Sequence, residues 1–117
     1  MTLPEHSPST GLSRRLLLDC ALLVPKHVHR VEIREITIPA NTAVGAHRHP
    51  CPVFGQIVEG TILFQLEGEP TRRLHPADVF YEPAHSAILH FDALDEQASF
   101  VAYFLLGEGE DNTLEML

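Results

Sequence analysis

The sequence has no tryptophan, only two cysteines, and half as many basic as acidic residues. Cys20 and Cys51 are too few for the disulfide framework of a small secreted domain, so we expect a reducing compartment and a cytoplasmic location. Eight basic residues against 16 acidic ones give a formal net charge of −8. Nucleic acids and anionic membranes are bound by basic surfaces. We therefore expect neither of them as a partner.

Long apolar runs are missing as well. The longest, Leu16 to Pro25, has about half of the ~20 residues that a membrane-spanning helix requires, and it contains Asp19. A transmembrane helix is therefore not expected. We interpret this run as an edge strand or a short docking segment.

Helical periodicity is almost absent, and short β-like runs take its place. They are punctuated by glycine and proline, as strands joined by turns are. The runs are RVEIREITI, VFGQIVEG, TILFQLEG, EPTRRL, DVFYEP, AILHFDA and SFVAYFLLG. About seven strands in a chain of this length predict an all-β domain, either an antiparallel sandwich or a small barrel.

The sequence also predicts two local features of the strands. The alternation in the run 30–38 slips at Arg34-Glu35, which predicts a β-bulge there. The Glu59-Gly60 junction predicts a tight hairpin turn.

The expected organisation is a flexible N-terminal arm over residues 1–12, a single barrel domain over 13–106, and an acidic tail over 107–117. The last residues of that tail could form a short helix.

The stretch GAHRHPCPVFGQIVEG, residues 45–60, carries the chemistry. His47 and His49 are two residues apart and therefore lie on the same face of a strand. Paired imidazoles on one face suit zinc, iron, nickel or copper. Cys51 shares their facing if the chain stays extended through the flanking prolines, which makes its thiolate a further candidate ligand.

The surroundings of these histidines resemble a family motif. PANTAVGAHRHP (39–50) followed by GQIVEG (55–60) is similar to the first motif of the cupin superfamily. ADVFYEP (77–83) is similar to the first half of the second motif, with Ala77 in place of the usual glycine. The resemblance covers about residues 30–106 and is to small, single-domain RmlC-like cupins.

That resemblance implies a fold and a ligand set. Cupins are double-stranded β-helix barrels of jelly-roll type, are frequently dimeric, and often hold one metal in the barrel mouth. A homodimer and one divalent metal (Fe, Ni, Mn or Zn) are therefore expected. The family's glutamate ligand falls on Val53, which cannot coordinate a metal, so one usual ligand is missing at its usual position.

The third ligand is left open between two histidines. The family's second-motif histidine falls on Ile88. His90 shares the facing of Ile88 in a strand and could reach the metal if the strand slips or bends slightly. His85, on the preceding loop, is the alternative. Either one, with His47 and His49, would give three nitrogen ligands and open coordination positions, as in a reactive site.

Three functions remain open from the sequence. The first is a small metal-dependent enzyme of dioxygenase or isomerase type, acting on a small oxygenated or aromatic substrate. The second is a barrel that binds or senses a small molecule without turning it over. The third is a degenerate, metal-free barrel that acts through dimerisation. Fold resemblance does not choose among these functions.

Overall fold

The computed structural model describes residues 6–7 and 11–117, so the predicted arm at 1–12 lies largely outside the described residues. The strands are β1 (His6–Ser7), β2 (Leu12–Ser13), β3 (Arg30–Ile38), β4 (His47–Arg48), β5 (Val53–Glu59), β6 (Ile62–Leu66), β7 (Arg72–Leu74), β8 (Val79–Glu82), β9 (Ile88–Ala93), β10 (Ala98–Leu106) and β11 (Glu115–Met116). None of the described residues is helical. Consequently, no helix among them is long and apolar enough to cross a membrane.

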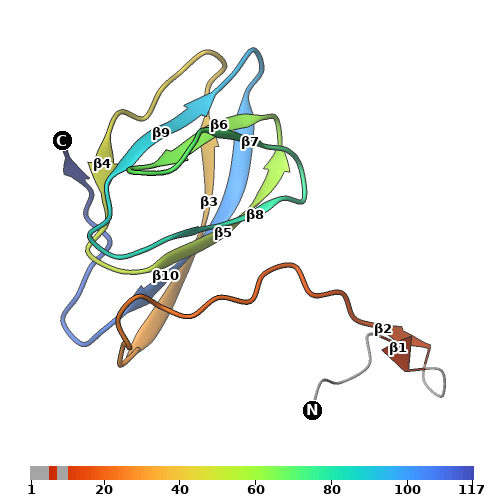
Figure 1. Cartoon of the computed structure of the whole chain (residues 1–117), viewed down its shortest axis with the longest axis vertical. Helices are drawn as coiled ribbons and strands as arrows, with labels where there is room; N and C mark the ends of the chain where they lie inside the picture. Colours follow the sequence, from red (N-terminus) through yellow and green to blue (C-terminus); the bar gives the residue numbers. More distant parts are fainter. Residues whose placement is uncertain (1–5, 8–10) are drawn as a thin grey trace.

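Two antiparallel sheets face each other and form the barrel (Figure 1). One has four strands in the order β3-β10-β5-β8, and the other has five in the order β11-β4-β9-β6-β7. The small β1-β2 hairpin lies away from both sheets, at the far end of an extended segment (Figure 1). The predicted all-β barrel of jelly-roll type is confirmed.

The core lies between the two sheets, where alternate residues of each strand point inward. Phe64 of β6 and Phe80 of β8 are almost fully buried, and Phe91 and Phe100 complete an aromatic cluster with ring centroids 4.9 to 5.9 Å apart. Two members of this cluster, Phe91 and Phe100, also line the cavity described below.

β3 is regular, and the bulge predicted at Arg34-Glu35 is not found. Its pairing with β10 runs without a break from Ile38 opposite Ala98 to Arg30 opposite Leu106. Because the strand keeps a single phase, Ile36 and Ile38 face the core, while Val31 and Ile33 face outward. The apolar residues before and after the predicted slip therefore lie on opposite faces of one regular strand, and those before it form an apolar outer surface.

The junction at Gly60 is a crossing between sheets, and the predicted hairpin there is wrong. β5 pairs with β10 and β8, whereas β6 pairs with β9 and β7, so the two consecutive strands belong to different sheets. Packing explains this arrangement, because Ile57 and Ile62 on either side of the turn are both buried in the common core. A flat hairpin could not place both strands in facing layers.

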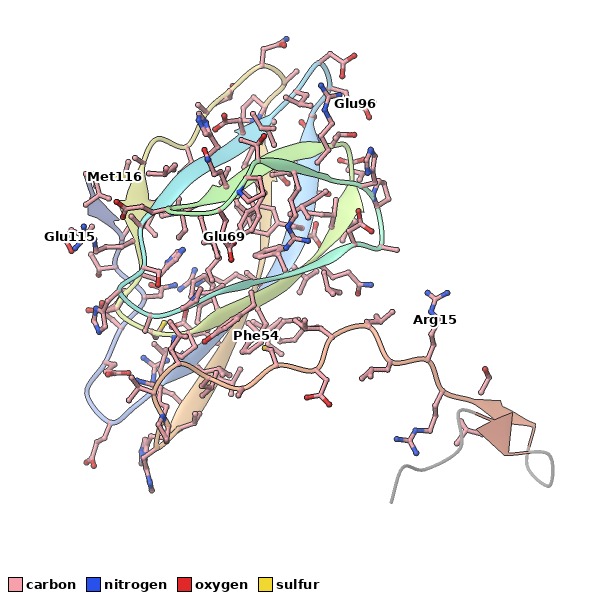
Figure 2. All side chains as sticks on the ribbon, in the orientation of Figure 1. Arg15, Phe54, Glu69, Glu96, Glu115 and Met116 are labelled. Carbon is pink, nitrogen blue, oxygen red and sulfur yellow. The ribbon has the colours of Figure 1, made fainter. Side chains whose placement is uncertain are left out.

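The apolar run at Leu16–Pro25 forms no strand. It passes near Phe54 on the outer face of the four-stranded sheet (Figure 2). Its first half borders a hollow that Phe54 and Tyr103 also line. Farther out, Arg15 lies on the stretch that leads away from the barrel (Figure 2). The run behaves as a docking segment in this respect, although several of its side chains stay exposed.

The tail folds back onto the barrel and ends in a strand, where a short helix was predicted. β11 pairs with β4, with Met116 opposite His47. Lys26 Nζ lies 2.5 Å from Glu110 Oε1, and this ammonium, helped by the Gly107 N–H, holds the pKa of the Glu110 carboxyl below its usual value. The tail is thus positioned beside the strand that carries the first histidine.

Candidate metal centre

His47 is the first residue of β4, and His49 directly follows this strand. Both are buried, with exposed fractions of 3% and 6%. Gly45 adopts φ +94°, a conformation that favours glycine, and its carbonyl oxygen accepts a 2.7 Å hydrogen bond from Nδ1–H of His47. With Nδ1 protonated, Nε2 of His47 keeps its lone pair for a ligand.

Glu82 supplies the third side chain of the cluster. One ligand atom from each of His47, His49 and Glu82 lies within 4.8 Å of the others, and all three residues are buried. Glu82 Oε1 is 3.5 Å from Nε2 of His49. Among the described residues, this is the cluster of histidine, cysteine and acidic side chains suited to a metal ion.

The position of Glu82 accounts for the valine at position 53. Val53 of β5 is the direct cross-strand partner of Glu82 of β8, and both face the interior. A carboxylate that the family resemblance places on one strand is therefore contributed by the neighbouring strand. The sequence contained a signal for it, because Glu82 is two residues from the buried Phe80 and so shares its inward facing.

His90 does not join this cluster. Gln65 of β6 is opposite His90, but Leu66 is opposite Ile88, so Leu89 is an additional residue in β9. This bulge turns His90 to the outside, where its Nδ1 lies 2.8 Å from Asp92 Oδ2. The expectation that His90 shares the facing of Ile88 is wrong, because Ile88 is buried and His90 is exposed.

His85 is also outside the cluster. It is exposed, has φ +65°, and its backbone N–H donates a 2.8 Å hydrogen bond to the carbonyl of His49. The contact between the two segments is made by the backbone and not by the imidazole. The structure therefore brings together His47 and His49 with Glu82, and with neither His85 nor His90.

The three side chains fit a divalent metal. Nδ1 of His49 and Oε2 of Glu82 are both buried and have no hydrogen-bond partner within the described chain. Buried polar atoms are normally satisfied, and a buried carboxylate is costly without a counter-charge. Two imidazoles and one carboxylate form a donor set used by zinc and by non-haem iron, and a cation here would compensate the buried charge.

These three residues line a cavity of about 490 Å³. Most of its wall is apolar and comes from both sheets and from the tail: Ile36, Ile38, Val44, Val53, Phe91, Phe100, Ala102, Phe104 and Leu114. The ring of Phe104 meets that of His49 edge-on, with centroids 5.9 Å apart. Such a site is able to hold a compact, largely apolar molecule against the histidines.

Cys51 is buried and lies outside the three-residue cluster. Its expected facing toward the histidines held only if the chain stayed extended, but β4 ends at Arg48 and β5 begins at Val53. Burial raises the pKa of the Cys51 thiol to about 11, from its ordinary value of 9.0. The thiol therefore remains protonated near neutral pH.

We predict that an alkylating reagent at pH 8 modifies Cys20 alone in the folded protein, and both cysteines after denaturation. Cys20 is exposed, whereas Cys51 is buried and lacks thiolate at this pH. Because burial raises the folded-state pKa, the thiol's contribution to stability is complete below pH 9 and is lost as the pH rises through about 11. Mass spectrometry of the labelled chain measures the modification. Rapid labelling of Cys51 in the folded state would contradict the prediction.

Comparisons with known proteins agree with this architecture. No family model matches the chain, and no curated protein matches it. Among solved structures, the DMSP lyase DddQ from Ruegeria pomeroyi DSS-3 superimposes with a TM-score of 0.66 and 23% identity, over 74% of this chain and 42% of that one. Oxalate oxidase in complex with the substrate analogue glycolate gives 0.64 and 16%, over 74% and 46%.

A smaller neighbour matches over more of its own length. An RmlC-like cupin from Shewanella frigidimarina NCIMB 400 gives a TM-score of 0.59 and 17% identity, over 69% of this chain and 70% of that one. The chain spans less than half the length of the lyase and of the oxidase. At these identities the likeness concerns the fold, and the chain has the fold of a cupin.

Proposed function

We propose that this cupin-fold chain is a small metal-dependent enzyme acting on a compact oxygenated or aromatic substrate. His47, His49 and Glu82 would hold one divalent transition metal from the group Fe, Ni, Mn and Zn. Two structural neighbours, a DMSP lyase and an oxalate oxidase, are enzymes, which supports the proposal that this chain is one as well. Each of those activities belongs to its own protein.

The observation that carries this proposal is a pair of buried atoms without a hydrogen-bond partner, Nδ1 of His49 and Oε2 of Glu82, in side chains that line a largely apolar cavity. A barrel that had lost its metal function would gain stability by replacing these groups with apolar ones. The burial of these two atoms without a partner supports a cation as the compensating group.

The chain's own residues would orient and enclose the substrate. A divalent cation held by His47, His49 and Glu82 would supply Lewis-acid polarisation of a substrate oxygen. The hydrogen bond to Gly45 fixes the ring of His47, the edge of Phe104 restrains His49, and the apolar wall excludes bulk water.

Elemental analysis of untagged protein tests the metal. We expect about one equivalent of a transition metal per chain, lost in a His47→Ala/His49→Ala variant and retained in a His90→Ala control. Absence of metal in the wild type, with no uptake of Fe(II), Ni(II), Mn(II) or Zn(II), would contradict the proposal. The barrel would then be a metal-free one, either binding a small molecule or acting through dimerisation.

We further propose that the chain forms a homodimer through the outer face of the four-stranded sheet. One row of cross-strand partners on this face consists of Ile33, Tyr103, Phe54 and Tyr81. Ile33 and Tyr103 are 62% and 40% exposed, and Phe54 and Tyr81 stack with centroids 4.7 Å apart. An apolar row of this length on the surface favours a protein partner.

Features of the segment 15–18 favour a second copy as that partner. Leu16, Leu17 and Leu18 are 66%, 48% and 42% exposed beside the same face. Neither Arg15 of this segment nor Glu35 of β3 has an ion-pair partner among the described residues. A two-fold arrangement would cover both apolar surfaces and bring these opposite charges together twice.

We predict that light scattering gives a solution mass of twice the 13.0 kDa of one chain. Ile33→Glu should produce monomers, because it places a charge in the apolar row. Leu117→Glu is the control, since Leu117 is 55% exposed on the other sheet's side. A monomeric wild type would contradict this prediction.

The expected cytoplasmic location and the absence of nucleic-acid and membrane partners remain predictions from composition.

A further inference from the structure

A single row of residues crosses the whole inner face of the four-stranded sheet. Glu32 of β3 is opposite Phe104 of β10, Phe104 is opposite Val53 of β5, and Val53 is opposite Glu82 of β8. Neighbouring strands are about 4.8 Å apart, so the two glutamates at the ends of the row are about 14 Å apart along the sheet and closer across its curvature. The row thus has polar ends and an apolar middle.

The end at β3 carries a cation at the cavity wall. Arg34 is the one positively charged side chain among the residues that line the cavity. Its Nε donates a 2.7 Å hydrogen bond to Oε1 of Glu32. The hydrogen bonds from Arg34 and Arg30 lower the pKa of the Glu32 carboxyl, so this carboxylate stays ionised and holds the guanidinium.

The terminal nitrogens of Arg34 remain available to a ligand. No hydrogen bond from its Nη1 or Nη2 is found within the described part of the chain, where only Nε is engaged. Asn112 of the tail also donates to Oε1 of Glu32, at 2.9 Å, and thereby shares that oxygen with Arg34. Arginine presents paired N–H groups that match the two oxygens of a carboxylate.

The surface between the two ends is apolar. Arg34 is opposite Ala102, and Phe104 and Val53 separate this region from Glu82. Ile36 lies next along the inner face of β3 and also lines the cavity. A ligand reaching from Arg34 to the histidines must therefore lie on hydrocarbon for most of its length.

We propose that the cavity binds a monocarboxylate with an apolar body and a second oxygen at its opposite end. The carboxylate meets Arg34, the body lies against Phe104, Val53 and Ile36, and the distal oxygen points at the cluster of His47, His49 and Glu82. The distal part of this assignment rests on the function proposed above, whereas the carboxylate end depends on Arg34 alone.

Calorimetric titration with three probes tests the assignment: 3-(4-hydroxyphenyl)propanoate, its neutral primary amide, and 3-phenylpropanoate. The wild type should bind the acid about tenfold more tightly than the amide, because one charge-assisted contact is made only by the acid. Arg34→Gln should remove this preference. Glu32→Gln should strengthen binding of the acid, because it removes the negative charge beside the Arg34 guanidinium.

Arg73→Gln is the matched control, because Arg73 is exposed on β7 and does not line the cavity. It should keep the full preference for the acid. The phenolic oxygen should add affinity only in metal-loaded protein, so the hydroxylated acid and 3-phenylpropanoate should bind metal-free protein alike.

The assignments of the two ends of the ligand can therefore be contradicted independently. Preference for the acid that depends on Arg34, in a protein that takes up no metal, would overturn the enzyme proposal and leave the carboxylate site standing. Equal binding of acid and amide, retention of the preference in Arg34→Gln, or no binding of the acid at millimolar concentration would each overturn the carboxylate site, whatever the metal content.

Discussion

Replacing Glu82 with glutamine should lower metal affinity by at least about 100-fold. Residues that merely support metal ligands contribute about 10- to 100-fold, so loss of the single anionic ligand should exceed that range. The neutral amide has the same shape but cannot compensate a divalent charge. In metal-free protein, Glu82→Gln should raise the melting temperature, since Oε2 of Glu82 is buried without a partner.

Competitive titration with a chromophoric chelator measures this affinity, and a thermal scan measures the stability. Glu59→Gln is the matched control, because Glu59 is exposed at the end of β5 opposite to Val53 and is not part of the cluster. Unchanged metal affinity in Glu82→Gln would show that the carboxylate is not a ligand.

The exchange Val53→Glu/Glu82→Val is a more demanding test of the same site. The two residues are direct cross-strand partners with inward-facing side chains, so the exchange moves the carboxylate by about one strand spacing of 4.8 Å. We expect partial recovery of the affinity lost in Glu82→Val. No recovery in a folded double variant would show that β8 is required as the source of the ligand.

Gly60→Ala should destabilise the protein by about 3 kcal/mol, with a melting temperature lower by about 10 °C. Gly60 has φ +77°, where a side chain is strained, and an added Cβ would lie 2.7 Å from the Cα of Ala98 and clash with the carbonyl oxygen of Gln97. Both obstacles are backbone atoms, so they cannot move aside as a flexible side chain could. The crossing between the two sheets would have to shift.

Gly68→Ala is the control for the backbone conformation alone. Gly68 has φ +83°, but an added Cβ would have no neighbour within 4 Å. Its cost should be the conformational strain only, about 1 kcal/mol. Chemical denaturation of both variants separates the two contributions, and equal costs would show that the contact with Ala98 is relieved without difficulty.

The fold was predictable because its determinants are local and repeated. Alternating apolar residues in short runs indicate strands wherever one face is buried, and glycine and proline mark the ends of the runs. The pairing of those strands was less predictable. β5 and β6 were expected to pair as a hairpin at Gly60, but their inward residues are buried in facing sheets.

The candidate site was half predictable, and strand phase explains which half. His47 and His49 follow from spacing and resemblance, and the structure places them together. His90 was misplaced because the extra residue at Leu89 is fixed by the pairing of β9 with β6, which no local pattern reveals. Glu82 was within reach, because its alternation with the buried Phe80 indicates an inward facing.

A backbone amide in the tail should respond to occupancy of the cavity. The amide of Leu117 donates a 2.9 Å hydrogen bond to the carbonyl of Ala46, while Leu114 lines the cavity. This amide becomes available for hydrogen–deuterium exchange only when the tail detaches from β4. A molecule that binds against Leu114 stabilises the attached state, so occupancy of the cavity slows exchange at Leu117 in proportion to ligand concentration over its dissociation constant. The exchange rate at one backbone position thus measures ligand affinity without any knowledge of the reaction.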